Sequence, residues 1–182
     1  GLREIASEAG VAQPTINYHF ESKIKLLEAV VEQGAERTVI ARQEKLARLM
    51  AKTSDVQLED IVRVLFQPYN QAGQISLEEQ TFHRFVGKLA ASENVNAKHI
   101  IMQAYDKMAV HFVEAMMQTP DRFSRQTAAR AYLCSLPTGM FAASHAHRFA
   151  KLVGDEAGLQ DAAYGFDDII TFICAGMRRM NV

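Results

Sequence analysis

The sequence predicts an all-α fold in which a short N-terminal helix-turn-helix head is followed by a larger helical bundle. Apolar residues recur at helical spacing through most of the 182 residues, and Gly and Pro number only 10 and 4. No segment alternates between apolar and polar residues as a half-buried strand does. The first 23 residues contain two short helical patterns, whereas the later patterns are long.

Residues 2–23 have the spacing of a helix-turn-helix. Ala6 is small where the two helices cross, Gly10 supplies a positive φ in the turn, and Ile16 is the apolar plug under the second helix. The inner face is expected to be completed by Ile5, Ala9, Val11 and Phe20. The residues expected to point outward, which suit bases and phosphates, are Gln13, Pro14, Thr15, Asn17, Tyr18 and His19.

The charge of the chain is not that of a typical nucleic-acid-binding protein. The net charge is −1, and Lys and Arg are balanced by Asp and Glu over residues 1–50. Binding to DNA would therefore depend on locally placed cations at Arg3, Lys23 and Lys25, and on two copies of the head at each site. The chain opens with Gly1 rather than Met, so we expect further residues upstream.

A long helix is predicted to begin directly after the motif, with Ser22 as its N-cap, and to run towards Met50. We assign residues 1–30 to the head and residues 31–182 to a second domain. Further helices are predicted at 55–68, 76–91, 97–118, 124–152 and 160–180. Ser54 or Asp55 is expected to cap the first of these, and Pro137 is expected to bend the fourth.

The segment up to Leu27 resembles the DNA-binding motif of the TetR family of bacterial transcriptional regulators. The matching positions are Ile5-Ala6, Ala9-Gly10-Val11, Thr15, Tyr18-His19-Phe20, Ser22-Lys23 and Leu26 or Leu27. Two positions depart from the pattern. Ala12 stands where the family usually has a capping Ser or Thr, and Asn17 stands where an aromatic residue is frequent.

The resemblance implies a cytoplasmic, all-helical homodimer in which the head binds double-stranded DNA and the second domain binds a small molecule. Members of the family are mostly repressors that leave palindromic operators when the ligand binds. The resemblance also places Tyr18, His19 and Lys23 at phosphate contacts.

An apolar ligand pocket is predicted between helices of the second domain for the group as a whole, although plain core packing is the better explanation for any one residue. The candidate pocket residues are Phe66, Tyr69, Phe82, Phe85, Met102, Tyr105, Met108, Phe112, Met140, Phe141 and His145. Polar anchors are expected from histidines or tyrosines, namely His83, His111, His145, Tyr69 or Tyr105. No charged cluster indicates a charged ligand, which favours a hydrophobic or aromatic one.

The last two helices are predicted to form the dimer interface as a four-helix bundle. The candidate interface residues are Tyr132, Phe166, Ile169, Ile170, Ile173 and Met177.

We expect no catalytic residue, metal or cofactor. Cys134 and Cys174 form no CxxC pair, so both are interpreted as buried reduced thiols. His145 and His147 are two residues apart and face different sides of a helix, which is poor metal geometry. Two alternatives to a regulator remain open, a helical carrier or enzyme for a small molecule and a helical protein-interaction adaptor. No stretch reaches the roughly 18 apolar residues of a membrane span, and no signal peptide is recognised.

Overall fold

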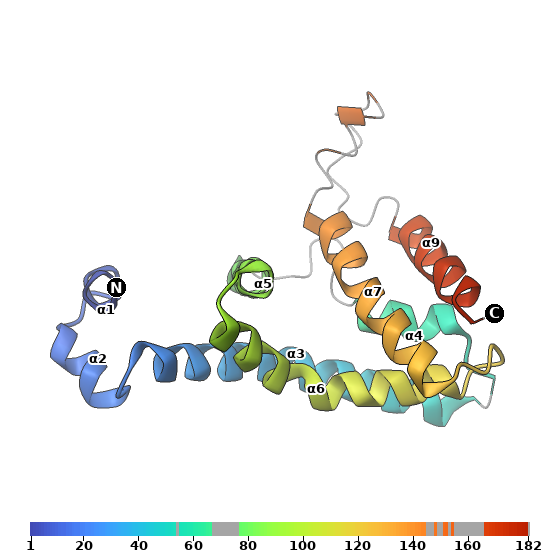
Figure 1. Ribbon diagram of the computed structural model, residues 1–182, viewed down its shortest axis with the longest axis horizontal. Coiled ribbons are helices and arrows are strands. Elements are labelled where there is room, and N and C mark those ends of the chain that lie inside the picture. Colours follow the sequence, from blue (N-terminus) through green and yellow to red (C-terminus); the bar gives the residue numbers. More distant parts are fainter. Residues whose placement is uncertain are drawn as a thin grey trace.

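The computed structural model describes residues 1–53, 55–66, 77–144, 148, 151, 152, 154 and 166–181 (Figure 1). Every regular element within these ranges is a helix, which confirms the predicted fold class. The helices are α1 (Leu2–Glu8), α2 (Gln13–His19), α3 (Lys23–Lys52), α4 (Leu58–Leu65), α5 (Leu77–Ala91), α6 (Val95–Met117), α7 (Arg125–Ser144) and α9 (Phe166–Arg179). No helix of the described part is long and apolar enough to cross a membrane.

Helix α3 connects the two ends of the molecule (Figure 1). Helices α1 and α2 lie at its beginning, and α4, α7 and α9 gather near its end. Helix α6 packs along α3, and α5 lies against the middle of α3, between the head and the bundle. The 30 residues of α3 correspond to about 45 Å of continuous helix. The head and the bundle are therefore joined by one uninterrupted element.

The core lies at the bundle end. In α4 the four residues at helical spacing are buried, namely Leu58, Ile61, Val62 and Leu65, as the apolar pattern predicts. They pack with α6, α7, α9 and the last turns of α3 around Phe112, which is fully buried.

An ion-pair network ties α9 to this core. Arg178 donates to both carboxylate oxygens of Glu59 on α4, at 2.6 and 2.8 Å, and its Nε lies 3.0 Å from Asp121 in the turn between α6 and α7. Arg63 of α4 pairs with Asp167 at the start of α9. The hydrogen bond from Arg178 lowers the pKa of Glu59 below 4.5, so this carboxylate stays charged at neutral pH. Both ends of α9 are thus bound to α4.

The helix boundaries follow local capping chemistry. Ser22 caps α3 as predicted, accepting a hydrogen bond from the Lys25 backbone at 3.2 Å. The prediction of Ser54 or Asp55 as the cap of α4 is wrong, because Gln57 occupies that position. The Gln57 backbone donates to the Asp60 carboxylate at 3.3 Å, which completes the first turn.

One further helix start differs from the predictions. Helix α6 begins two residues earlier than predicted, because Asn94 caps it. Pro137 lies inside α7 as predicted. The predicted start of the last helix at Gln160, and the capping Ser76, fall outside the described residues.

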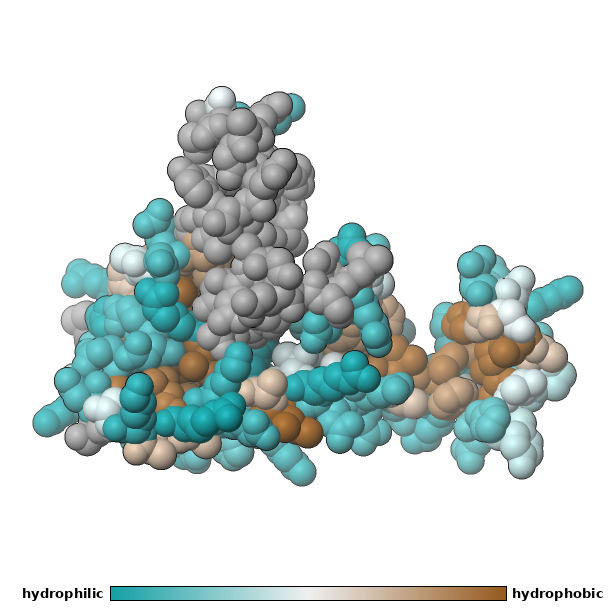
Figure 2. Space-filling view, turned by 180° about the vertical axis from the view of Figure 1, so that it is seen from behind, coloured by the Kyte–Doolittle hydropathy of each residue, from teal (hydrophilic) through white to brown (hydrophobic). Residues whose placement is uncertain are grey.

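Four predicted burials are corrected by the structure. Cys174 is buried in the core, whereas Cys134 lies on the exposed side of α7 beside the exposed Leu133. Burial raises the pKa of Cys174 to about 12. Ile5, Ala9 and Val11 are exposed rather than inward-facing, because no other described element covers this side of α1 and the turn. Figure 2 shows the resulting apolar surface on the head and the first part of α3.

Candidate nucleic-acid interface

The head has the geometry that its spacing predicts. Gly10 adopts a φ of 66° in the turn, and the Val11 backbone donates to the Ala6 carbonyl at 3.0 Å. Ala6 and Ile16 are the buried residues of α1 and α2, and they hold the two helices together. All three motif positions are therefore confirmed.

Helix α2 presents the residues predicted to contact DNA. All six of its candidates are exposed, namely Gln13, Pro14, Thr15, Asn17, Tyr18 and His19. Tyr18 is 86% exposed, and its ring meets that of His19 edge-on at a centroid distance of 5.3 Å. Ala12 provides no side-chain cap, as its residue type requires, and Pro14 is the second residue of the helix. The helix thus displays an amide, a hydroxyl, an aromatic hydroxyl and an imidazole over seven residues.

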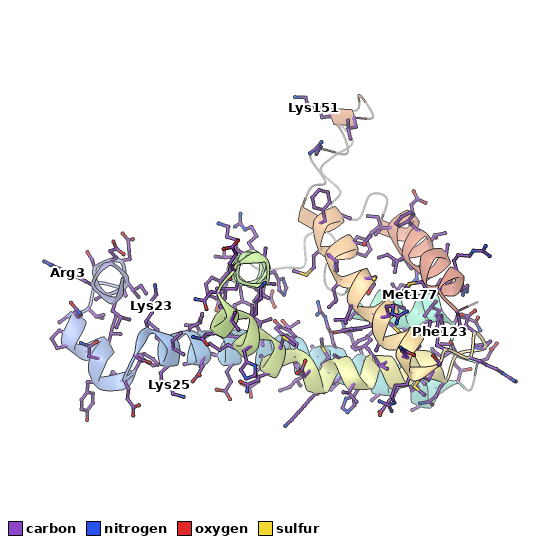
Figure 3. The ribbon with its side chains drawn as sticks, in the orientation of Figure 1. Arg3, Lys23, Lys25, Phe123, Lys151 and Met177 are labelled. Carbon is purple, nitrogen blue, oxygen red and sulfur yellow. The ribbon has the colours of Figure 1, made fainter. Side chains whose placement is uncertain are left out.

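The cations near the head do not form one patch. Lys23 and Lys25 leave α3 on opposite sides, and Arg3 extends from α1 (Figure 3). Lys25 pairs with Glu28 at 2.7 Å, and this hydrogen bond raises the pKa of Lys25. Lys23 is exposed at the α2–α3 junction, and of the two lysines in the first turn of α3 it is the one not paired with Glu28.

Comparison with known protein families identifies both parts of the chain. Residues 1–30 match the family of bacterial regulatory proteins of the tetR type, and residues 63–176 match a tetracyclin repressor-like C-terminal domain. The second match alone covers more than half of the chain. The chain belongs to the TetR family. It is a DNA-binding transcriptional regulator with α1 and α2 as its DNA-binding head. No curated protein matches it in sequence.

The residues predicted to line a pocket of this TetR-family chain are divided by the structure into three groups. Phe66, Met108 and Phe112 are fully buried and fill the core, with Phe66 against Phe166 and Phe112 against Tyr132. The half-buried group consists of Phe82, Phe85, Tyr105 and Met140. The exposed group consists of Met102 and Phe141, which therefore cannot line an enclosed pocket in a single subunit. Tyr69 and His145 lie outside the described residues.

Helix α5 brings part of the half-buried group together. The ring centroids of Phe82 and Phe85 lie 6.5 Å apart, and Met140 of α7 packs over Gly87 of α5.

Both ring nitrogens of His83, also on α5, are shielded from solvent. Burial, assisted by the charge of Arg42, lowers the pKa of His83 to about 4, so the imidazole is neutral at pH 7. Of the other predicted anchors, His111 lies at the surface, 3.1 Å from Gln43.

Arg42 is a residue that the sequence analysis missed. It is only 8% exposed, and its charge acts on His83 of α5 and on Tyr132 of α7. Arg42 lies on the buried face of α3, in helical register with Val31, Ala35 and Leu46. This spacing in the sequence could have predicted its burial. This cation enters the region between α3, α5 and α7, where the sequence analysis expected no charge.

The predicted dimer residues mostly lie inside the subunit. Five of them are buried in the core of the single chain, which leaves little of their surface for a second subunit, namely Tyr132, Phe166, Ile170, Ile173 and Met177. Ile169 is partly buried against the same core. The opposite faces of the two helices carry Leu133 and Phe141 on α7 and Phe172 on α9, which are 64%, 58% and 71% exposed.

Proposed function

We propose that this regulator is a dimeric repressor that leaves a palindromic operator when a small, mainly apolar molecule binds its C-terminal domain. One observation carries the proposal. The exposed α2 face is joined through α3, without a break, to a bundle that contains half-buried aromatic residues. Movement in the bundle therefore has a rigid path to the DNA-binding surface. Homodimerisation and response to a ligand are typical of TetR-family proteins.

Base and phosphate contacts are assigned to the exposed face of α2 and to Lys23. Thr15, Gln13 and Asn17 offer hydrogen-bonding groups for base edges, and Pro14 offers an apolar surface for a thymine methyl group. Tyr18, His19 and Lys23 suit phosphates. One such head carries little positive charge and would bind weakly. Two heads about 34–36 Å apart would read both halves of a palindrome.

The outward faces of α7 and α9 are proposed as the dimer interface in place of the buried stripe. The two helices pack against each other, and each carries large exposed apolar side chains, Leu133 and Phe141 on α7 and Phe172 on α9. Large apolar side chains gathered at this level of exposure indicate an interaction surface. Two helices from each subunit would then form a four-helix bundle about a twofold axis.

The effector is proposed to bind beside α5, against Phe82, Phe85 and Met140. These side chains are half-buried. The ring centroids of Phe82 and Phe85 lie 6.5 Å apart on α5, and the end of the Met140 side chain reaches Gly87 of the same helix. A mainly apolar molecule fits this aromatic lining. Domain boundaries at residues 30 and 31 are retained as part of the proposal, with α3 starting in the head and ending in the second domain.

The DNA contacts are tested with Tyr18→Ala and Thr15→Ala in the full chain. Fluorescence anisotropy against an operator recovered from random duplexes should show each variant binding at least several-fold more weakly, since one specific contact contributes about 1–3 kcal/mol. Val95→Ala, an exposed position on α6, is the control and should bind like the unchanged protein. Equal operator affinity in all four proteins would contradict the assignment of α2.

The dimer interface is tested with Phe172→Asp and Leu133→Asp. Sedimentation should show a shift from dimer to monomer, because a charge would enter an apolar interface, and operator binding should fall with it. Val110→Asp on the exposed face of α6 should remain dimeric. A dimer that persists in both α7 and α9 variants would place the interface elsewhere.

The ligand response is tested with a panel of apolar and aromatic compounds. A compound that raises the melting temperature should also release the protein from the operator, and Phe85→Ala should weaken both effects. A compound that binds beside Phe85 and leaves operator affinity unchanged would contradict the proposed response and would favour a carrier.

A further inference from the structure

A positive charge is buried on the inner face of α3. Arg42 is 8% exposed, and within the described part of the chain it is the one charged side chain that is buried. It stands in helical register between Ala35 and Leu46, which are also buried. An apolar side chain of similar volume often stabilises such a position as well or better, since taking a charge out of water is costly. The charge of Arg42 therefore indicates a function other than packing.

Groups on α5 and on α7 lie within reach of this charge. It acts on His83 of α5 and on Tyr132 of α7, whose pKa values burial shifts to about 4 and about 12. About 12 Å along α3 from Arg42, the ring of Phe82 lies where a Cβ of Gly34 would stand. Helix α5 therefore packs directly against the backbone of α3, and both α5 and α7 lie on the same side of α3 (Figure 1).

Two carboxylates act on the same pair of side chains. Glu79 of α5 acts on His83, and Asp106 of α6 acts on Tyr132, in each case less strongly than Arg42 does. Asp106 is exposed, so solvent and salt screen its charge. The buried cation is therefore the charge that both side chains share and the one that acts on them most strongly.

The same two side chains adjoin the proposed effector region. His83 follows Phe82 in α5, and Met140 lies about two turns beyond Tyr132 on α7. A molecule that packs against Phe82 and Met140 can therefore place one end towards Arg42. The planar guanidinium group donates two parallel hydrogen bonds to a carboxylate, and one carboxylate carries the single negative charge that one arginine balances.

We propose that the effector is an amphipathic carboxylate, whose acid group pairs with Arg42 and whose apolar body packs against Phe82, Phe85 and Met140. The buried cation selects the acid over a neutral compound of the same shape, because charges attract more strongly where solvent is excluded. This inference rests on the proposed effector site beside α5 and names the chemical class of the molecule that binds there.

The test compares acids with neutral molecules of the same shape, using the full chain. The probes are octanoate with octanol and phenylbutyrate with phenylbutanol, each titrated by isothermal calorimetry at neutral pH. At least one acid should bind about 10-fold or more tightly than its alcohol, since hydrogen bonds to charged groups are the stronger ones. The pair that shows the difference tells whether the body is aliphatic or aromatic. Equal affinity within both pairs, or no binding of either acid, would overturn the inference.

Variants of Arg42 assign the preference to the guanidinium group. Arg42→Gln should weaken binding of the acid by about 10- to 100-fold and leave binding of the alcohol unchanged. Arg42→Lys keeps the charge without the planar fork and should give an intermediate affinity. Arg37→Gln, at an exposed position of the same helix, is the matched control and should bind like the unchanged protein. Equal weakening of acid and alcohol in a folded Arg42→Gln protein would overturn the inference, and the comparison in the unchanged protein decides if this variant fails to fold.

The imidazole of His83 gives a second readout. An acid bound at Arg42 compensates the positive charge that acts on His83, so the pKa of His83 should be higher with the acid bound than with the alcohol bound. A titration followed by nuclear magnetic resonance measures this difference, and equal values would overturn the inference. An acid that binds in an Arg42-dependent way but leaves operator affinity unchanged would instead contradict the proposed ligand response, while the assignment of the ligand class stands.

Discussion

The head and the bundle differ in how they are stabilised. In the head, α1 and α2 are seven residues each and bury only Ala6 and Ile16. In the bundle, α4, α6, α7 and α9 bury large side chains completely, and Arg178 adds bidentate ion pairs between segments far apart in the chain. The comparison shows that the DNA-binding surface has almost no core of its own. A unit with so few buried side chains should open locally at a lower free-energy cost than the bundle.

The largest effect should come from the bundle. Phe112→Ala removes a fully buried ring, and it should lower the free energy of unfolding by about 3–5 kcal/mol. Urea denaturation followed by circular dichroism measures this loss. Met102→Ala on the same helix is exposed and should change stability by about 0.5 kcal/mol or less. Equal effects at both positions would mean that α6 is packed differently.

In the head, Ile16→Ala should have a local effect. It removes the plug between α1 and α2, a loss of about 2–5 kcal/mol to a unit with little other packing. Hydrogen exchange should become fast over residues 2–19 and stay slow over α6, and operator binding should be lost. Ile5→Ala, at an exposed position of α1, is the control. If the whole chain lost stability with Ile16→Ala, the head and the core would be one cooperative unit.

A smaller effect is expected where the head joins α3. Ser22→Ala removes the hydroxyl that accepts from the Lys25 backbone, at a cost of about 1 kcal/mol in helix stability. Exchange of the amides in the first turn of α3 should quicken. Ser22→Asp can accept the same hydrogen bond and should keep the slow rate. Equal rates in the two variants would show that the cap does not hold this junction.

The smallest effect should be the acid sensitivity of the ion pair between Glu59 of α4 and Arg178 of α9. The folded-state pKa of Glu59 lies below its ordinary 4.5, so its stabilisation is complete above that pH and is lost as the pH falls through the lowered pKa. Glu59→Gln should cost about 1 kcal/mol or less at pH 7, because both partners remain about one third exposed. The difference from the unchanged protein should vanish in acid. A difference that persists at low pH would reflect packing rather than charge.

The structure of the head could be predicted from the sequence because local interactions determine it. Spacing fixed the roles of Ala6, Gly10 and Ile16, and the capping hydroxyl of Ser22 located the start of α3. The apolar stripe of α9 was equally clear, but periodicity shows only that a face is buried, and here its partner is the subunit's own core. The ion pair between Arg178 and Glu59 joins residues 119 positions apart, and no local sequence pattern predicts it.

Residues whose role depends on tertiary packing were harder to predict. Arg42 was not recognised because a single charge on an apolar face is usually solvated, whereas here the side chain is buried in the packed molecule. The seat of Phe82 at Gly34 also depends on how α5 crosses α3, which no spacing within either helix specifies.

The central claim is that two heads, spaced by α3, read one symmetric site on DNA. The most direct test is a hydroxyl-radical footprint of the full-length protein on a duplex selected from random sequence. The account predicts two protected segments related by a twofold axis and centred about 34–36 Å apart, both lost together in Phe172→Asp. A single protected segment, or protection that shows no sequence preference, would contradict it.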